Sequence, residues 1–169
     1  MSNRPPGPIP DSYWVVPRQL LAGEYPGAGD EEAALVKLEL LREAGVDMFL
    51  DLTEEGEYGL APYAPFLAGL GYVRLAVRDF ACPTEDEMIH ILDTIDAAIE
   101  AGRTPYVHCY GGVGRTGTVV GCYLVRHGLA AQDALSSIAA WRSGTPEAYR
   151  TSPETQAQRD MVLGWASGK

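Results

Sequence analysis

Apolar residues along the chain follow two patterns, short continuous runs and longer stretches with helical spacing. The short runs are typical of buried strands and predict strands at residues 13–16, 20–22, 46–52, 72–77 and 106–108. The longer stretches are typical of helices and cover residues 30–44, 84–102, 116–126, 133–142 and 153–165. Strands that alternate with helices predict an α/β fold, with a central mostly parallel sheet and helices on both faces.

Polar residues mark the ends of two of these helices. Glu31 and Glu32 stand in a first turn, where the helix dipole favours anions, and Gly45 supplies a stop. Thr84 followed by Glu87 matches a capping box, in which each side chain accepts a hydrogen bond from the other residue's backbone N–H. Both helices are therefore expected to begin at these signals.

Length and the proline-rich beginning indicate the domain organisation. A chain of 169 residues has the length of one domain with one substantial core. Pro5, Pro6 and Pro8 exclude a helix at the start, and the segment lacks the apolar centre of a signal peptide. We therefore expect a flexible arm over residues 1–12, a single domain over residues 13–169 and a cytoplasmic location.

The formal net charge of −10 limits the possible partners. Such a charge repels nucleic acid and anionic membranes, so neither is expected as a partner. An anionic substrate has to be held at close range, by arginines and backbone N–H groups. The cysteines, Cys82, Cys109 and Cys122, have no paired spacing, so neither a disulfide framework nor a zinc knuckle is expected.

The segment 108–117, HCYGGVGRTG, lies where a predicted strand ends and a predicted helix begins. Ligands of α/β sheets gather at the carboxyl ends of strands, and a helix N-terminus there offers unpaired N–H groups to an anion. Glycines let the backbone curl around a tetrahedral anion. We expect the backbone of these residues to bind phosphate: Tyr110, Gly111, Gly112, Val113 and Gly114.

Cys109 enters this loop at its base. There the N–H groups and Arg115 are expected to stabilise its thiolate, the form that acts as a nucleophile. Arg115 offers a bidentate fork to two phosphoryl oxygens. The hydroxyl of Thr116 is expected next to the sulfur, where it can stabilise Cys109 as a leaving group. His108 is expected to orient the loop rather than to transfer protons.

Other interpretations of the segment have to be weighed. A cysteine after a strand is often only a small buried apolar residue, which is our interpretation of Cys122. The glycines at 112, 114 and 117 also match the dinucleotide fingerprint, but no strand ending in an acidic residue follows at the required distance. A Walker loop would need a lysine where Arg115 stands.

Residues 108–116 resemble the His-Cys-x5-Arg-Ser/Thr signature of the protein tyrosine and dual-specificity phosphatases, and look closest to the cyclin-dependent-kinase-associated phosphatase group and its bacterial relatives. Residues 21–26 (LAGEYP), the run MFLDL at 48–52 and Ser152-Pro153-Glu154-Thr155 extend the likeness. The resemblance implies a protein-tyrosine-phosphatase-like fold and metal-independent hydrolysis of a phosphate monoester through a phosphocysteine at Cys109. It implies no cofactor, and a phosphorylated protein or peptide as substrate.

The resemblance also implies roles for residues outside the loop. Asp79 stands in the place of the general acid that protonates the leaving oxygen, and Asp86 is a weaker substitute. Glu154 and Gln158 fall in the segment that positions the hydrolytic water. Glu154 occupies the principal glutamine's place, so Gln158 is the better candidate, although a solvent-facing helix residue is the more common outcome for either.

Two further expectations concern the rim and the cysteines. Tyr63, Phe66 and Tyr110 are candidates for aromatic residues around the mouth of the site. Cys82, close to Asp79 in the sequence, is a candidate redox partner of Cys109.

Four other functions have to be weighed at this point. A phosphatase-like domain could bind phosphorylated residues without turnover, and a sulfurtransferase or arsenate reductase would also use a Cys–Arg loop. An inositol phosphate phosphatase is disfavoured, because the loop lacks lysines between Cys109 and Arg115. The sequence does not decide between phosphotyrosine and phosphoserine or phosphothreonine.

Overall fold

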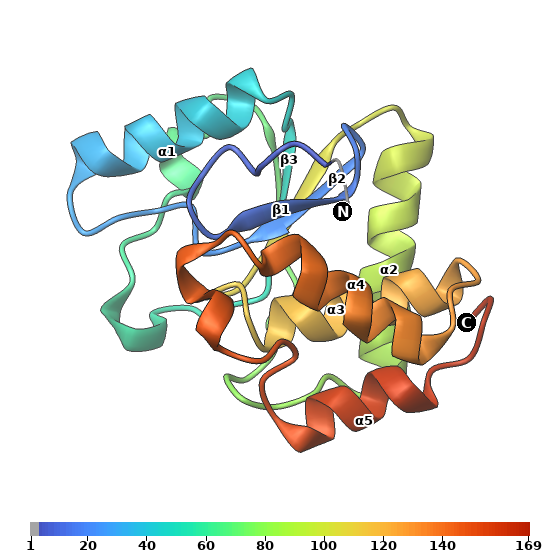
Figure 1. Ribbon diagram of the computed structural model, residues 1–169. Coiled ribbons are helices and arrows are strands. Elements are labelled where there is room, and N and C mark those ends of the chain that lie inside the picture. The colour runs from blue at the N-terminus through green and yellow to red at the C-terminus, as the bar shows by residue number, and fades with distance from the viewer. Residues whose placement is uncertain (1–3) are drawn as a thin grey trace.

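A computed structural model describes residues 4–169 and arranges them around one five-stranded sheet (Figure 1). The strands are β1 (Ser12–Val16), β2 (Leu20–Gly23), β3 (Met48–Asp51), β4 (Gly71–Arg74) and β5 (Pro105–His108). Their order across the sheet is β1-β2-β5-β3-β4. Only β1 pairs antiparallel, with β2, and the other neighbours are parallel. The predicted mostly parallel sheet is confirmed.

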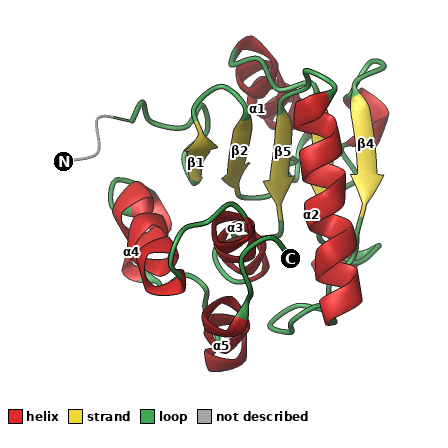
Figure 2. Cartoon of the chain, turned by 90° about the vertical axis from the view of Figure 1, so that its right-hand side faces the viewer, coloured by secondary structure: helices red, strands yellow, loops and turns green. Residues whose placement is uncertain are grey.

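Helices cover both faces of this sheet, as predicted (Figures 1 and 2). The helices are α1 (Glu31–Glu43), α2 (Glu85–Glu100), α3 (Arg115–Arg126), α4 (Ala131–Arg142) and α5 (Gln156–Gly164). α1 lies on one face, α2 and α3 pack on the other, and α5 packs on α3 and α4. No helix in the described part of the chain is long and apolar enough to cross a membrane.

Alternation along the strands divides the core between the two faces. Phe49 and Tyr106 lie with Leu41 of α1, whereas their neighbours Leu50 and Val107 lie with α2 and α3. Successive side chains of a strand point to opposite faces, so an apolar run over β3 and β5 supplies both cores at once. This double burial explains why both strands read as continuous apolar runs.

The helix boundaries follow the capping signals closely. Asp30 accepts a hydrogen bond from the N–H of Ala33, and Thr84 forms the predicted capping box with Glu87. Thr155 forms a second capping box with Gln158, so α5 begins after it and not at residue 153 as expected. β3 begins at Met48, two residues later than predicted, and β4 ends at Arg74, although the N–H of Leu75 still donates to the carbonyl of Asp51.

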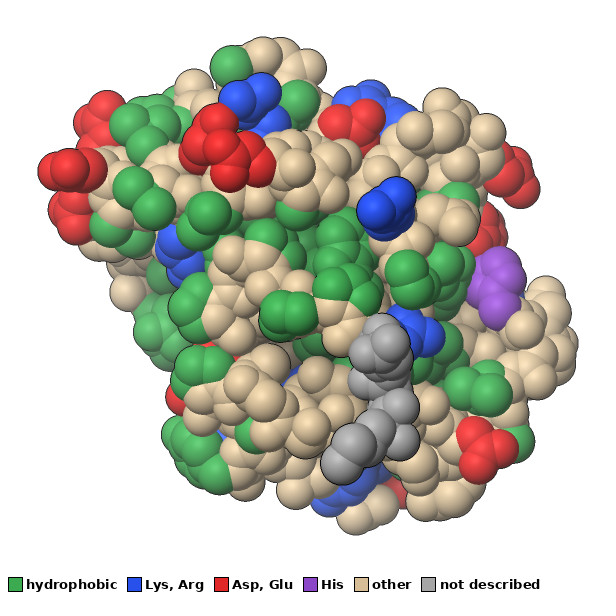
Figure 3. Space-filling model, turned by 45° about the horizontal axis from the view of Figure 1, so that its top comes forward, with side chains coloured by type: hydrophobic (Ala, Val, Ile, Leu, Met, Phe, Trp, Pro, Cys, Tyr) green, Lys and Arg blue, Asp and Glu red, His purple; other side chains and the backbone are tan. Residues whose placement is uncertain are grey.

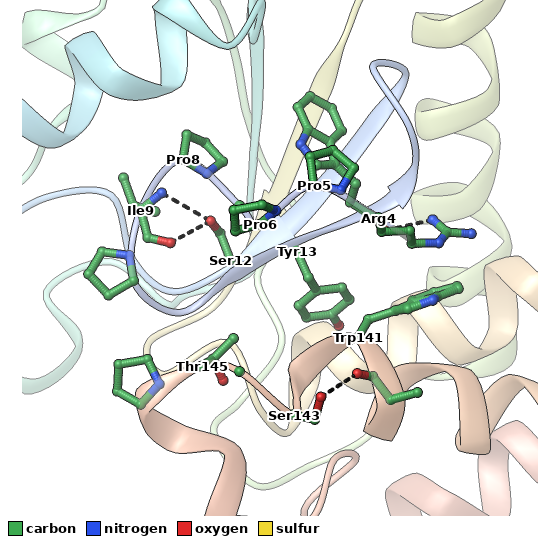
Figure 4. A pocket seen from close by; sticks show the side chains of 16 residues that line it. Arg4, Pro5, Pro6, Pro8, Ile9, Ser12, Tyr13, Trp141, Ser143 and Thr145 are labelled. Atoms are coloured by element: carbon green, nitrogen blue, oxygen red, sulfur yellow. Dashed lines mark hydrogen bonds between the residues drawn. The ribbon is translucent and has the colours of Figure 1, made fainter. Parts of the chain in front are cut away.

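The N-terminal segment packs more closely than was predicted (Figure 4). A flexible arm was expected over residues 1–12, but residues 4–12 pack against the domain, while residues 1–3 lie outside the described part. Ile9 is only 3% exposed, and the hydroxyl of Ser12, already in β1, bonds its backbone N–H and carbonyl. The guanidinium of Arg4 lies 4.0 Å from the ring centroid of Trp141. Prolines exclude a helix, but they do not prevent an extended segment from packing.

Candidate active site

Parallel strands place three functional loops at one edge of the sheet. β5, β3 and β4 are parallel neighbours, so the segments after their carboxyl ends lie close together. The loop after β5 carries Cys109, the segment after β3 carries Glu57 and Tyr58, and the loop after β4 carries Asp79. Residues far apart in sequence therefore meet at this edge.

The loop 109–114 has the backbone that an anion cradle needs. Gly112 has a φ of 72°, and a Cβ there would fall 2.5 Å from the carbonyl carbon of Gly23, so only glycine fits. Val113 is buried, and its carbonyl accepts a hydrogen bond of 2.6 Å from the hydroxyl of Ser152. The loop leads directly into Arg115, the first residue of α3.

Cys109, Arg115 and Asp79 line one cavity of about 180 Å³. The loop residues Tyr110, Gly111, Val113 and Gly114 line it as well. Cys109 is 3% exposed and Arg115 2% exposed, so the groups at the base are almost shielded from water. Low exposure strengthens electrostatic interactions there, because less water screens them.

Arg115 is held by carboxylates on one edge of its guanidinium. Its Nη1 and Nη2 donate to the two carboxylate oxygens of Glu57 at 2.7 and 2.6 Å, and Nη1 also donates to the carbonyl of Val77 at 2.9 Å. Burial disfavours the charged guanidinium, but Glu57 and the nearby Cys109 outweigh it and raise the pKa of Arg115. Nε is buried and has no hydrogen-bond partner within residues 4–169. It is the donor left for an incoming oxygen.

Asp79 lies beside the same guanidinium. Its Oδ1 is 3.2 Å from Nη2 of Arg115 and accepts a hydrogen bond of 3.0 Å from the N–H of Phe80. Its Oδ2 accepts a hydrogen bond of 2.7 Å from the hydroxyl of Tyr58. The predicted general acid is therefore in the cavity, with a different partner on each oxygen.

Sequence reasoning missed Glu57 and Tyr58. Their segment, EEGEYG at residues 54–59, follows the buried strand β3 almost directly. Charged residues just beyond the carboxyl end of a parallel strand were the available signal, because ligands gather at that edge. The Glu57 side chain is 6% exposed, unusually low for a glutamate in a loop.

His108 is fully buried behind the loop. Its Nδ1 lies 3.1 Å from the carbonyl oxygen of Cys109, so Nδ1 carries the proton, and Nε2 accepts from the hydroxyl of Tyr63. Burial lowers the pKa of His108 to about 4, although Asp51 opposes this shift. Neutral His108 can thus orient Cys109 through its carbonyl.

The expected aromatic rim needs correction. Tyr63 is 1% exposed and belongs to the core around His108, and Phe66 is half-buried against the same core. Tyr110 is 50% exposed and does lie at the mouth. Its ring centroid is 5.6 Å from that of Tyr58, which is 67% exposed. Tyr58 and Tyr110 therefore lie at the rim together with Phe80, which is 55% exposed and lines the same cavity. The hydroxyl of buried Tyr63 bonds to His108.

Two predicted supporting residues lie close to the loop with their hydrogen bonds already made. Thr116 is buried, and its hydroxyl donates a hydrogen bond of 3.4 Å to the carbonyl of Gly23, which competes with donation to the Cys109 sulfur. Gln158 is fully buried, so the alternative of a solvent-facing residue is wrong. Its Oε1 accepts from the N–H groups of Glu154 and Thr155, and its Nε2 donates to the carbonyl of Ala81.

Glu154, the other candidate for water positioning, is hydrogen-bonded to Arg150 beside the cavity. Its Oε1 accepts a hydrogen bond of 2.6 Å from Arg150, and both residues line the cavity. Gln158 holds α5 to the Asp79 loop, whereas Glu154 is partly exposed at the wall. The water-positioning role of either residue stays a prediction.

All three cysteines are free thiols. Cys122 is buried in the core of α3, as expected, and burial raises its pKa to about 12. Cys82 is partly buried, and a redox pairing with Cys109 stays a prediction. Within residues 4–169, no cluster of three or more His, Cys, Asp or Glu side chains could hold a metal ion.

Comparison with known proteins agrees with this geometry. The family model Tc-R-P, described as the DSP-PTPase phosphatase of polymorphic toxin systems, matches residues 26–129, more than half of the chain. The chain therefore belongs to this family of phosphatases, and the resemblance inferred from its signature is confirmed.

Individual relatives point to the same superfamily. The tyrosine-protein phosphatase cdc-14 of Caenorhabditis elegans is 26% identical over 143 residues, 80% of this chain and 19% of that protein. The phosphatidylglycerophosphate phosphatase PTPMT1 of Arabidopsis thaliana is 34% identical over 89 residues, 52% of this chain and 26% of that protein. The chain thus spans a minor part of the length of either relative. The crystal structure of kinase associated phosphatase has a TM-score of 0.74 at 17% identity, covers 90% of each chain and shows the shared fold.

Proposed function

We propose that this chain hydrolyses phosphate monoesters of proteins, without a metal ion, through a phosphocysteine at Cys109. The observation that carries the proposal is the meeting of buried Cys109, the unpartnered Nε of Arg115 and the Asp79 carboxyl in one small cavity. These groups are the nucleophile, the anion donor and the proton donor that such a reaction needs.

The reaction divides into two displacements at phosphorus. The Cys109 thiolate attacks, the bond from phosphorus to the ester oxygen breaks, and Asp79 gives its proton to that oxygen. Arg115 and the loop N–H groups stabilise the phosphoryl oxygens during transfer. Water then attacks the phosphocysteine, loses a proton to the Asp79 carboxylate, and the sulfur leaves as a thiolate. Asp79 and Cys109 regain their starting states.

The charges around the cavity favour a phosphoprotein over an inositol phosphate or a phospholipid. Arg150 is paired with Glu147 and Glu154, and Arg115 with Glu57. The loop itself contains no lysine. A headgroup with several phosphates needs several unpaired cations, whereas both arginines are paired with carboxylates and Arg115 keeps only its Nε for a ligand. One phosphoryl group fits the free Nε of Arg115.

The rim favours an aromatic phosphoester. Tyr58 and Tyr110 expose 67% and 50% of their surface beside the opening, where a phosphotyrosine ring can contact them. Aromatic pairs in offset or tilted arrangements gain about 0.5–1.5 kcal/mol beyond apolar burial. We therefore expect phosphotyrosine to be hydrolysed faster than phosphothreonine.

The test is hydrolysis in the presence of EDTA by the wild type, Cys109→Ser and Cys82→Ser, which changes a cysteine outside the cavity lining. Substrates are a phosphotyrosine peptide, the matching phosphothreonine peptide, inositol phosphates and phosphatidylglycerophosphate vesicles. We expect turnover of the peptides by the wild type and Cys82→Ser, and none by Cys109→Ser. Preferential turnover of the lipid would contradict the substrate proposal.

Absence of turnover on every substrate would overturn the catalytic proposal. Tight phosphopeptide binding would then indicate a binding domain, and sulfur transfer from thiosulfate to cyanide would indicate a sulfurtransferase. The cytoplasmic location stays a prediction, which fractionation of the native cell would test.

A further inference from the structure

We propose that Tyr58 is a positioning residue that holds Asp79 over the leaving oxygen during phosphoryl transfer. The inference rests on the proposed function, because it assigns Tyr58 a part in protonation of the leaving group. It goes beyond the signature, since within residues 4–169 the Tyr58 hydroxyl is hydrogen-bonded to Asp79 and to neither Cys109 nor Arg115. The contact that carries it is the hydrogen bond of 2.7 Å from that hydroxyl to Oδ2 of Asp79.

The two oxygens of Asp79 are used differently. Oδ1 lies 3.2 Å from Nη2 of Arg115, on the side where a phosphoryl group would bind, and Oδ2 is bound by Tyr58. A substrate that takes Nη2 together with the free Nε of Arg115 removes the arginine partner from Asp79. The Tyr58 hydroxyl on Oδ2 and the N–H of Phe80 on Oδ1 are then the groups that keep the carboxyl in place, and Oδ1, no longer paired with Arg115, carries the transferable proton.

The backbone around Tyr58 is built for this contact. Tyr58 has a φ of 50°, between Gly56 at 72° and Gly59 at 70°, and Phe80 beside Asp79 has a φ of 61°. Left-handed backbone at a residue other than glycine costs about 1–3 kcal/mol and persists only where its surroundings enforce it. The neighbouring Glu57 holds the chain beside Tyr58, because its carboxylate is bound to Arg115. Adjacent residues thus hold the arginine and the general acid.

Core packing does not account for this placement. Tyr58 leaves 67% of its surface exposed, so its burial contributes little to stability. Its ring is 5.6 Å from that of Tyr110, at the mouth of the cavity. The hydrogen bond to Asp79 raises the pKa of Tyr58, so the hydroxyl stays a donor at neutral pH.

The test is Tyr58→Phe, which removes the hydroxyl and keeps the ring. Two small substrates are compared, phenyl phosphate, whose leaving group needs a proton, and p-nitrophenyl phosphate, whose leaving group needs little help. We expect kcat/KM to fall about tenfold on phenyl phosphate, the equivalent of one hydrogen bond to a charged group. The fall on p-nitrophenyl phosphate is expected to be several times smaller.

Two controls separate this role from a structural one. Tyr149→Phe removes the hydroxyl of another exposed tyrosine, which donates to the Glu147 carboxylate, and is expected to leave both rates unchanged. In an Asp79→Asn background, Tyr58→Phe should have no further effect, because Tyr58 acts through Asp79. The inference would be overturned if Tyr58→Phe lowered kcat/KM equally on both substrates. It would also be overturned if Tyr58→Phe caused the same loss in the Asp79→Asn background. Inactivity of the wild type on both substrates would instead overturn the proposed function.

Discussion

At the scale of single residues, the burial of His108 couples the active-site loop to pH. The pKa of His108 is lowered to about 4 by burial, from 6.5, which outweighs the opposing effect of Asp51. The unfolded chain therefore binds a proton between pH 6.5 and 4 that the folded chain does not. Because the unfolded state holds more protons in this window, stability falls as pH falls through it. The contribution of the neutral His108 ring to the free energy of unfolding is fully present above pH 6.5.

We predict that the free energy of unfolding contributed by this group falls by about 2 kcal/mol between pH 7 and pH 5. Urea unfolding at both pH values measures the total, and His108→Asn, which cannot take up the proton, should show a smaller fall. If this variant does not fold, NMR of the wild-type His108 ring can show whether it stays neutral at pH 5. Protonation of the ring near pH 6.5 would contradict the prediction.

How well the site could be predicted differs from residue to residue. Cys109 and Arg115 could be proposed from the sequence because the signature lies in one contiguous loop, and Asp79 followed from the resemblance. Glu57 is separated from Arg115 by 58 positions, so its role depends on how β3 and β5 pair. The positions of Tyr63 and Gln158 were misjudged because both bury polar groups on partners distant in sequence.

At the scale of elements, local signals were sufficient for most helices and strands. Capping residues fixed the starts of α1 and α2, and double-sided burial marked β3 and β5. The packing of residues 4–12 was not predicted, because Ile9 and Arg4 find their partners in β1 and α4, which composition does not reveal. The type of an element depends on its local sequence, whereas the segments it packs against are distant in the sequence.

The contact between α3 and α5 gives a prediction at this scale. A Cβ at Gly121 would lie 2.5 Å from a methyl carbon of Val162, so Gly121→Ala forces these helices apart. We expect it to lower the free energy of unfolding by about 1–3 kcal/mol, a typical cost of overpacking. Gly164→Ala is the matched control in α5, with nothing within 4 Å of its Cβ.

Urea unfolding of both variants measures the difference. Gly164→Ala should be neutral or more stable by up to about 1 kcal/mol, because alanine favours a helix. A loss of the same size in both variants would show that the α3–α5 approach is not the cause.

At the scale of the whole molecule, the proposed anion-binding site lies within an acidic chain. The formal charge is −10, and on the face shown in Figure 3 acidic side chains stand out over α1, with basic side chains interspersed among other surface residues. In the proposed function, Arg115 and the loop backbone of the cavity bind the phosphoryl group at close range, whereas the field of the net charge acts at a longer distance. Salt therefore weakens the repulsion more than the binding contacts.

This difference predicts opposite salt dependence for two phosphotyrosine peptides of equal length, one with glutamates and one with lysines beside the phosphorylated residue. Raising the ionic strength from about 0.01 M to about 0.15 M shortens the screening length from roughly 30 Å to roughly 8 Å. The kcat/KM of the glutamate peptide should then rise severalfold, because the charge of −10 no longer opposes its approach, and that of the lysine peptide should fall. Steady-state rates at several salt concentrations measure both slopes. Equal slopes would mean that the net charge does not govern the encounter, and that recognition depends on contacts at the rim alone.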